Sequence, residues 1–167
     1  MRLRILATPF HRMTVEQTRA HRETVLLRLL LRTTQAETKD LVERLVALGH
    51  RGVSPSAIGL LGNLDTEGTR LTVLAARTGN TRQAVGQLVR DLEARGYVER
   101  APDPADGRAV LVRHTATGRR LLADALAEMD DIERGYEAII GTHRMTALKK
   151  ALSMLADAVE PSGRLAP

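Results

Sequence analysis

The sequence contains no cysteine and no tryptophan, and it has only one phenylalanine and two tyrosines. The absence of cysteine excludes disulfides, thiolate metal sites, cysteine nucleophiles and thiol-based redox sensing. With aromatic residues at 2%, the core must be aliphatic, which suits helix packing. No apolar run approaches the roughly 18 residues of a membrane span, and the apolar stretch in MRLRILATPF is too short for a secretion signal. We therefore expect no membrane partner and a cytoplasmic location.

Length and composition indicate about one folded domain. At 167 residues, 43% of them hydrophobic, the chain is long enough to bury a core. There is no glycine-rich phosphate loop, the serines lack a nucleophile motif, and no histidine stands at metal-ligand spacing or in a recognisable pair with an acid. The five histidines are scattered over unrelated segments, at His11, His21, His50, His114 and His143. We expect no catalytic activity, no metal and no cofactor.

Positive charge gathers in two blocks of the chain. Residues 1–32 and 70–120 each carry a formal charge of +5, whereas residues 33–69 carry −2 and residues 121–167 carry −3. Of the 25 cationic residues 22 are arginine, which genome composition alone would also explain. The functional interpretation of the middle block is a polyanionic partner such as DNA.

Apolar spacing and capping residues predict a mainly helical chain with one β-hairpin. YVERA (97–101) and RAVLV (108–112) are predicted strands, joined by the tip PDPADG. Helices are expected over about residues 15–48, from Ser54–Pro55 to about 64, from a Thr72 N-cap to Gly79, from a Thr81 N-cap to about 95, from Thr115 or Thr117 to about 136, and over 142–158.

The predicted helix 81–95 has two faces and follows a short helix and a tight turn, an arrangement that indicates a helix-turn-helix. One face repeats apolar residues at helical spacing and is expected in the core: Val85, Leu88, Val89 and Leu92. The other suits base edges and phosphates: Arg82, Gln83, Gly86, Gln87 and Arg90. Glycine inside a helix costs roughly 0.5–1 kcal/mol relative to alanine. We therefore expect Gly86 to make space, either toward DNA or beside a neighbouring element; an ordinary solvated face is the alternative.

The hairpin supplies a second candidate contact. Arg100 and Arg108 flank a tip that contains Asp103 and Asp106. Asp106 stands two residues before Arg108, so its carboxylate is expected to orient that guanidinium. An arginine at a hairpin tip can enter a narrow minor groove, where the potential is most negative. The alternative is a surface ion pair worth less than about 1 kcal/mol.

The order of these elements resembles the winged helix-turn-helix of the MarR family of bacterial transcriptional regulators. The likeness runs over about residues 20–158, and its diagnostic pieces are LEARGYVER, the wing tip DPADGR and TATGR at the start of the next helix. It implies a mainly α fold with a small β-wing, in which a winged unit (53–113) is flanked by dimerisation helices (15–52 and 114–160). Residues 1–14 form an expected flexible arm and 161–167 a tail, and the family's first strand would be Thr69–Leu71. One departure is His114, where the family commonly has an apolar residue.

By this resemblance the protein is a homodimer that binds an inverted-repeat operator in double-stranded DNA, with one recognition helix in the major groove of each half-site. Thr72 would present its hydroxyl and backbone donors to a phosphate, and Arg108, supported by Asp106, would enter the minor groove. The complete set of expected DNA-binding residues is Thr72, Thr81, Arg82, Gln83, Gln87, Arg90 and Arg108.

Two apolar stripes agree with a dimer. Met145, Leu148, Leu152, Leu155 and Val159 are spaced 3, 4, 3 and 4, and a similar stripe precedes them at Leu121, Leu122, Ala125, Met129 and Ile132. Because the winged unit is too small to cover the long flanking helices, a partner chain is the simpler cover. The alternative is that both stripes cover the protein's own core.

The resemblance also implies a small-molecule effector, and in the first place a repressor that the ligand releases from DNA. No residue signature identifies the ligand. Candidate pocket walls are Val25–Leu31, Pro55–Leu61 and Leu121–Met129, with His21, His50 and Tyr136 either as polar handles or in structural roles. Two other functions stay open: a winged helix that binds protein, and an architectural protein that binds DNA without sequence preference.

Overall fold

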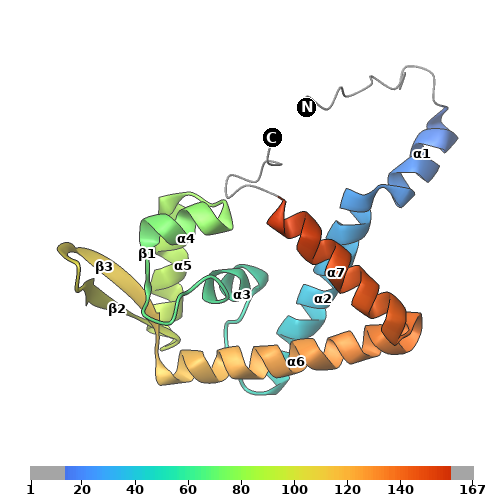
Figure 1. Ribbon diagram of the computed structural model, residues 1–167. Coiled ribbons are helices and arrows are strands. Elements are labelled where there is room, and N and C mark those ends of the chain that lie inside the picture. Colours follow the sequence, from blue (N-terminus) through green and yellow to red (C-terminus); the bar gives the residue numbers. More distant parts are fainter. Residues whose placement is uncertain (1–13, 159–167) are drawn as a thin grey trace. The chain divides into compact units, whose positions relative to one another are not determined.

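The computed structural model describes residues 14–158, apart from the side chains of residues 20, 107 and 108. Within them the chain divides into two compact units, one of residues 39–141 and one that combines the flanking segments up to residue 38 and from 142 onward. The elements are α1 (Val15–Thr24), α2 (Leu26–Ala47), α3 (Pro55–Leu61), β1 (Thr69–Arg70), α4 (Leu71–Thr78), α5 (Arg82–Ala94), β2 (Val98–Asp103), β3 (Asp106–His114), α6 (Ala116–Ile140) and α7 (Thr142–Asp157) (Figure 1). The predicted fold class, mainly helical with a small β-wing, is confirmed.

The first predicted helix is in fact two. Thr14 opens α1 with a reciprocal capping box, in which its side chain accepts from the Gln17 N–H and Gln17 returns the bond. At Val25 the backbone is extended (φ −65°, ψ 129°), so α1 ends and α2 begins one residue later. The β-branched pair Thr24–Val25, which favours extended backbone, stands at the break. The prediction of one helix over 15–48 was wrong at this point.

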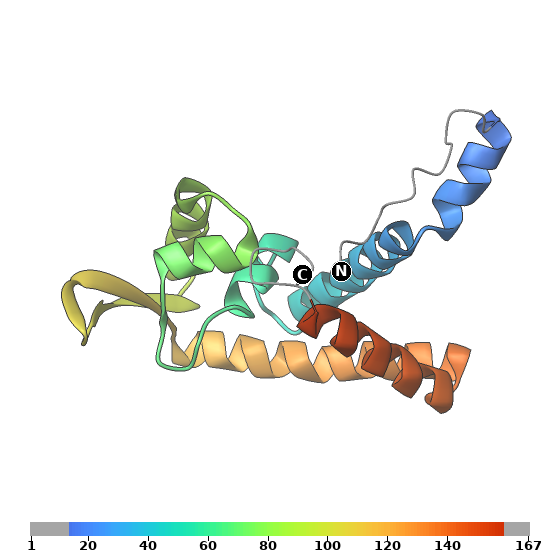
Figure 2. The ribbon, with the colours of Figure 1, turned by 45° about the horizontal axis from the view of Figure 1, so that its top comes forward.

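In the 39–141 unit, three strands form an antiparallel sheet in the order β1-β3-β2. β1 pairs with β3 through Thr69↔Val112 and Arg70↔Leu111, which confirms the short first strand. The strands of the hairpin are longer than predicted and leave only Pro104 and Ala105 as the turn. The Asp103 carboxylate accepts the Ala105 N–H at 2.8 Å, which closes the turn in the manner of an Asx-turn. The hairpin projects from the helices of this unit in both views (Figures 1 and 2).

β1 runs directly into α4, with no loop between them. Arg70 is at once the last strand residue and the N-cap of α4, and its side chain makes no capping bond. Because strand pairing fixes Arg70 against Leu111, the helix begins at Leu71. The prediction that Thr72 caps this helix was therefore wrong.

Helices α3–α6 and the sheet enclose one aliphatic core. The fully buried side chains come from every element of the winged segment except β1 and from its two flanking helices: Leu45, Leu60, Leu74, Val85, Val89, Leu92, Val98, Val112 and Leu121. Thr115 N-caps α6 by accepting the Gly118 N–H at 3.0 Å, and α6 continues to Ile140, past the predicted end at 136. A Cβ at Gly118 would lie 1.9 Å from the Tyr97 carbonyl oxygen, so only glycine lets α6 approach the sheet this closely.

Candidate nucleic-acid interface

The candidate interface is built on a helix-turn-helix made of α4 and α5. Gly79 ends α4 in the left-handed conformation (φ +65°), where its N–H bonds to the carbonyls of Ala75 and Ala76. Thr81 then opens α5, since its hydroxyl accepts the Ala84 N–H at 3.2 Å. The predicted Thr81 cap is confirmed, and its hydroxyl hydrogen remains as a donor at the exposed start of α5.

The two faces of α5 lie as the spacing predicts. Val85, Val89 and Leu92 are buried in the core and Leu88 is partly buried. The four polar residues on the opposite side are all exposed: Arg82, Gln83, Gln87 and Arg90. Within the described part of the chain, Arg82 makes no hydrogen bond or ion pair, so its guanidinium is available to an anion.

Gly86 differs from the prediction. It is buried and forms part of the floor of a groove of about 340 Å³ between α5 and the sheet, the wing groove, lined by Leu71, Arg82, Gln83, Gly86, Arg90, Arg100, Val110 and Val112. A Cβ at Gly86 would meet only Arg90 Nη1, at 3.8 Å, which is ordinary contact. Among the described residues no neighbouring element therefore needs the space, so crowding within the chain does not explain the glycine.

A polar chain on the surface of α5 orients Gln87. Arg90 Nη2 donates to Gln87 Oε1 at 2.6 Å, and Gln87 Nε2 donates to Asp91 Oδ1 at 2.9 Å. These contacts fix which end of the amide faces which neighbour and leave one N–H and one lone pair for a base edge. The sequence predicted that Gln87 and Arg90 share one face. The hydrogen bonds of Gln87 follow from helical spacing, since Arg90 stands at i+3 and Asp91 at i+4.

The acids of the wing do not form a bare tip, because Arg70 pairs with them. Asp103 is 7% exposed, and its Oδ2 accepts from Arg70 Nε at 2.7 Å. The N–H of Ala105 and the guanidinium of Arg70 hold the pKa of Asp103 below its usual range. Asp106 Oδ2 lies 3.6 Å from Arg70 Nη2. Arg70 thus neutralises the acids of the turn, a role that the sequence did not indicate.

Arg108 and Thr72 are the two remaining residues predicted to contact DNA. The side chain of Arg108 lies outside the described residues, so its minor-groove role and its support by Asp106 stay predictions. Thr72 lies exposed in the first turn of α4, where backbone N–H groups are free to donate, although it is not the cap.

Several arginines of the basic block hold the winged unit together. Arg100, which flanks the tip in the sequence, pairs with the recognition helix, where its Nε lies 3.4 Å from Glu93 Oε2. Arg95 donates to the Asp91 carbonyl at 2.7 Å and Arg113 to the Glu67 carbonyl at 2.7 Å. Such bonds leave the positive charge in place, so these residues serve the fold and the surface potential together.

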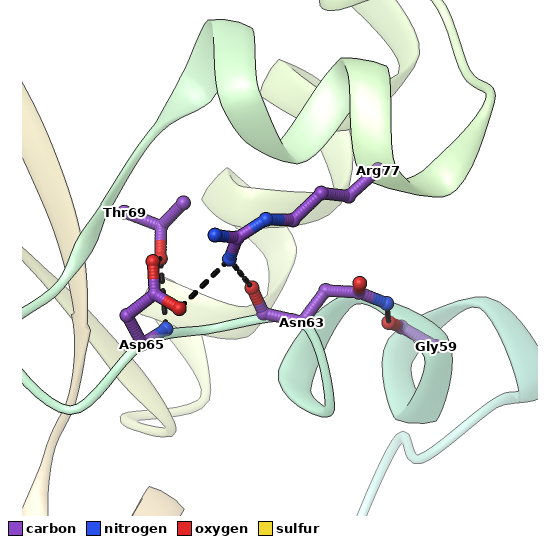
Figure 3. A network of polar contacts seen from close by, with 5 residues as sticks. All are labelled: Gly59, Asn63, Asp65, Thr69 and Arg77. Atoms are coloured by element: carbon purple, nitrogen blue, oxygen red, sulfur yellow. Dashed lines mark hydrogen bonds and ion pairs between the residues drawn. The ribbon is translucent and has the colours of Figure 1, made fainter. Parts of the chain in front are cut away.

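Arg77 is the clearest case (Figure 3). Its Nη1 donates to Asp65 Oδ1 and to the Asn63 carbonyl, both at 2.9 Å, so it ties α4 to the loop before β1. Thr69 Oγ1 receives the Asp65 N–H at 2.8 Å and donates to Asp65 Oδ2 at 3.2 Å. The Arg77 guanidinium lowers the pKa of Asp65.

A separate apolar cavity of about 250 Å³, the core cavity, lies between α3 and α6. Two of the three predicted pocket walls, Pro55–Leu61 and Leu121–Met129, supply its lining, and Leu45 of α2 completes it. The lining residues are Leu45, Ile58, Leu61, Gly62, Leu121, Leu122, Ala125, Leu126 and Met129.

Two polar links join the region of α2 to α6. His50 Nε2 lies 2.8 Å from Asp124 Oδ2, and Arg44 Nη1 donates to Glu128 Oε2 at 3.1 Å. The sequence showed no histidine–acid pair because the two residues stand 74 positions apart. His50 thus has a structural partner. In the described part of the chain no group of three or more histidine and acidic residues can hold a metal ion, and none of the helices combines the length and hydropathy of a bilayer crossing.

Comparison with known proteins agrees with this geometry. Residues 51–109 match the model of the MarR family. MarR from E. coli in its apo form is 21% identical with a TM-score of 0.66, covering 78% of this chain and 96% of that chain. CouR from Rhodococcus jostii RHA1 bound to p-coumaroyl-CoA is 29% identical with a TM-score of 0.63, covering 80% of this chain and 93% of that chain. CouR bound to a 23-mer DNA duplex is 24% identical with a TM-score of 0.65, covering 87% of this chain and 99% of that chain. No curated protein sequence matches the chain significantly.

A helix-turn-helix whose second helix presents a polar face beside a projecting hairpin defines the winged-helix class of transcriptional regulators. Within that class the chain is similar to MarR-family proteins, since the family model matches residues 51–109 and the solved MarR-type structures extend over most of the chain. The resemblance stated from the sequence is confirmed.

Proposed function

We propose that the protein is a dimeric, sequence-specific DNA-binding regulator that recognises an inverted repeat and is released from it by a small molecule. The observation that carries the proposal is the exposed set Arg82, Gln83, Gln87 and Arg90 on the second helix of the helix-turn-helix. Glutamine and arginine can form bidentate bonds with adenine and guanine edges, and an unpaired arginine suits a phosphate.

We expect the other contacts to lie around this helix. Thr81 and Thr72 stand at the exposed starts of α5 and α4, where backbone N–H groups and hydroxyls attract phosphate. The open floor at Gly86 lets the helix backbone approach the edge of a duplex. Arg108, supported by Asp106, enters the minor groove from the wing.

Dimerisation is proposed through the segments 15–52 and 114–160, which flank a DNA-binding unit of 53–113. Large apolar side chains on α2, α6 and α7 stay exposed in the single chain: Leu26, Leu27, Leu29, Leu31, Leu126, Ile139, Leu148, Met154 and Leu155. Met145 of the predicted C-terminal stripe is buried, and Val159 lies outside the described residues. So much exposed apolar surface on helices favours a partner chain.

The core cavity is the proposed effector site. It adjoins α3, which contacts both α4 and α5, so a ligand that displaces α3 from α6 also displaces the recognition helix. The CouR structures with p-coumaroyl-CoA and with a DNA duplex support a regulator of this kind. Coupling requires that the ligand bind one conformation more tightly than the other.

The test is a selection of bound duplexes from a random DNA pool at near-physiological salt. Enrichment of an inverted repeat with half-sites about 34–36 Å apart is the expected result. Binding without enrichment would favour an architectural protein, and absence of binding would favour a protein-interaction module. The two glutamines, which suit bases better than phosphates, weigh against the architectural alternative.

A further inference from the structure

A basic groove lies where α1 meets α2, and we call it the α1–α2 groove. The extended backbone at Val25 separates the two helices, and both ribbon views show them offset at this break (Figures 1 and 2). The groove has a volume of about 520 Å³, and its residues all belong to the unit that contains the segment up to residue 38. Residues of both helices surround this one concavity: Val15, Thr18, Arg19, Arg22, Glu23 and Arg28.

The arginines of this groove differ from most of those in the winged unit, where Arg70 is paired with Asp103 and Arg77 with Asp65. Among the described residues, the arginine side chains that make no hydrogen bond or ion pair are those of Arg19, Arg22, Arg28, Arg32, Arg51 and Arg82. Most of this set lies within residues 19–32. All the arginines that line the groove belong to it, so their donors are available to an external anion.

The local charge balance favours an anionic ligand. Residues three apart are neighbours on a helix surface, so Arg19 and Arg22 bring two positive charges together. Arg28 adds a third from α2, whereas Glu23 is the one acidic residue of the lining. Repulsion between the guanidinium groups opposes this local arrangement, and a bound anion relieves it. The groove therefore has the charge expected of a site for an anion that carries more than one negative charge.

We infer that the α1–α2 groove binds a nucleoside diphosphate. Guanidinium groups bind phosphate oxygens in pairs of charge-assisted hydrogen bonds, so the arginines hold the two phosphates. A carboxylate can accept hydrogen bonds from the hydroxyls of a ribose, so Glu23 holds the sugar. Val15, 90% exposed, offers an apolar surface to the base. None of these residues belongs to the expected DNA-binding set or lines the core cavity, so the inference goes beyond the proposed function and does not rest on it.

The shape and the acids of the groove favour a compact ligand over the phosphate backbone of DNA. A duplex presents its phosphates as a continuous row on a convex surface, with one charge per about 1.7 Å of helix axis. Glu23 in the lining and Glu16 on the same helix would meet such a row with like charge. A nucleotide has few charges, and its sugar carries hydroxyl donors beside them. The concavity therefore suits a single nucleotide better than a duplex.

The test is calorimetric titration of the full chain, without DNA or divalent cations, with ADP, AMP and adenosine. We expect ADP to bind, AMP to bind at least about tenfold more weakly and adenosine to give no measurable heat, since each phosphate removed takes charge-assisted hydrogen bonds with it. Equal affinity for ADP and AMP would overturn the inference. So would failure of ADP to bind, which is the result expected if a second copy of the chain covers the groove.

A matched pair of substitutions on α2 locates the site. Arg28→Gln removes a guanidinium that lines the groove, whereas Arg32→Gln removes one that is also exposed and unpaired among the described residues but lies about one turn further along the helix. The affinity for ADP is expected to fall at least about tenfold in the first variant and to stay within about twofold of the unaltered protein in the second. Equal losses in the two variants would indicate attraction by overall charge alone and would refute the site.

Arg22→Gln, on α1, repeats the test from the other helix with the same expected loss, and it decides the assignment if Arg28→Gln does not fold. If ADP fails to bind and Arg28→Gln instead loses affinity for duplexes of random sequence, the phosphates belong to DNA and the inference is wrong. Failure to select an operator would count against the proposed regulator, but it would leave these titrations interpretable.

Discussion

Gln87 stands at the centre of the exposed face of α5, held between Arg90 and Asp91 by bonds of 2.6 and 2.9 Å. Because its amide is oriented before any DNA arrives, less side-chain entropy is lost on binding. An oriented amide also presents a defined donor and acceptor, which favours one base over the others.

Gln87→Ala is expected to relax base preference at one position of each half-site by about 1–3 kcal/mol. Competition binding against operators altered at single positions measures this effect. Gln35→Ala, at an exposed position on α2, serves as the control and should leave base preference unchanged. A loss that is uniform over all sequences would mean that Gln87 contacts only the backbone.

His114 is expected to make the stability of the protein depend on pH. Both ring nitrogens are buried without a hydrogen-bond partner among the described residues. Burial lowers the pKa of His114 below its ordinary value of 6.5, with Arg119 acting in the same direction and the Leu61 carbonyl opposing it. His114 is therefore protonated at a lower pH in the folded chain than in the unfolded chain, where it titrates near pH 6.5.

The free energy of unfolding should accordingly fall as the pH drops from about 6.5 toward the lower folded-state pKa, since the unfolded state binds more protons there. In His114→Leu this loss should be smaller. Urea denaturation of both proteins at pH 7.5 and 5.5 provides the measurement. Asp65 and Asp103, whose pKa values lie below the ordinary value of 3.8, titrate outside this window. An identical pH dependence in the two proteins would assign the effect to other groups.

At the scale of the elements, the junction between the sheet and α6 depends on Gly118. A methyl group there would collide with the Tyr97 carbonyl, and backbone cannot move aside cheaply. Gly118→Ala is expected to destabilise the fold by about 1–3 kcal/mol or more, as measured by thermal and urea unfolding.

Gly135, in the same helix, provides the control, because a Cβ there meets nothing within 4 Å. Gly135→Ala should stabilise the protein by about 0.5–1 kcal/mol through helix propensity alone. If both substitutions stabilised the protein, the close approach at Gly118 would not exist in solution.

The wing is the other element with a testable role. Arg108→Ala is expected to weaken operator binding without changing the oligomeric state, and to reduce the salt dependence of the binding constant. Arg120→Ala, with a side chain 77% exposed near the start of α6, is the control for the lost charge. Unchanged affinity in Arg108→Ala would remove the minor-groove assignment.

The sequence predicted the ends of these elements correctly where short-range interactions determine them. It predicted them wrongly where tertiary contacts determine them. Thr81 and Thr115 cap α5 and α6 because a cap is a short-range interaction. The start of α4 depends instead on the pairing of Arg70 with Leu111, 41 residues away in the chain, which no local pattern reveals.

In the candidate site, too, local patterns were predictable and tertiary contacts were not. The polar face of α5 was predictable from spacing alone, whereas the inward turn of Asp103 depends on Arg70 and the pairing of Arg100 depends on Glu93. Gly86 was correctly identified as unusual, but its burial beside the sheet needed the three-dimensional arrangement of α5, β2 and β3.

For the whole molecule, the main expectation is a dimer in which two winged units act together. Leu148 and Leu155 of α7 are 45% and 48% exposed in the single chain. Light scattering is expected to give twice the mass of one chain. Leu148→Glu should yield monomers, and affinity for a two-half-site operator should fall by about 10²–10⁴ because the linked second contact is lost.

Ser153→Glu, at an exposed position of the same helix, adds the same charge and should leave both quantities unchanged. A monomeric wild-type chain, or a Leu148→Glu protein that still dimerises, would place the interface elsewhere.

The direct run of β1 into α4 at Arg70 has a consequence for engineering. Arg70 belongs to the sheet by its backbone, opens the first helix of the helix-turn-helix, and holds Asp103 and Asp106 of the wing by its side chain. Transplanting α5 and the wing without β1 and α4 into a related scaffold would leave the wing joined to a foreign first helix. A chimera that carries residues 69–114 as one piece keeps these contacts from a single parent, so operator preference is best exchanged as that whole block.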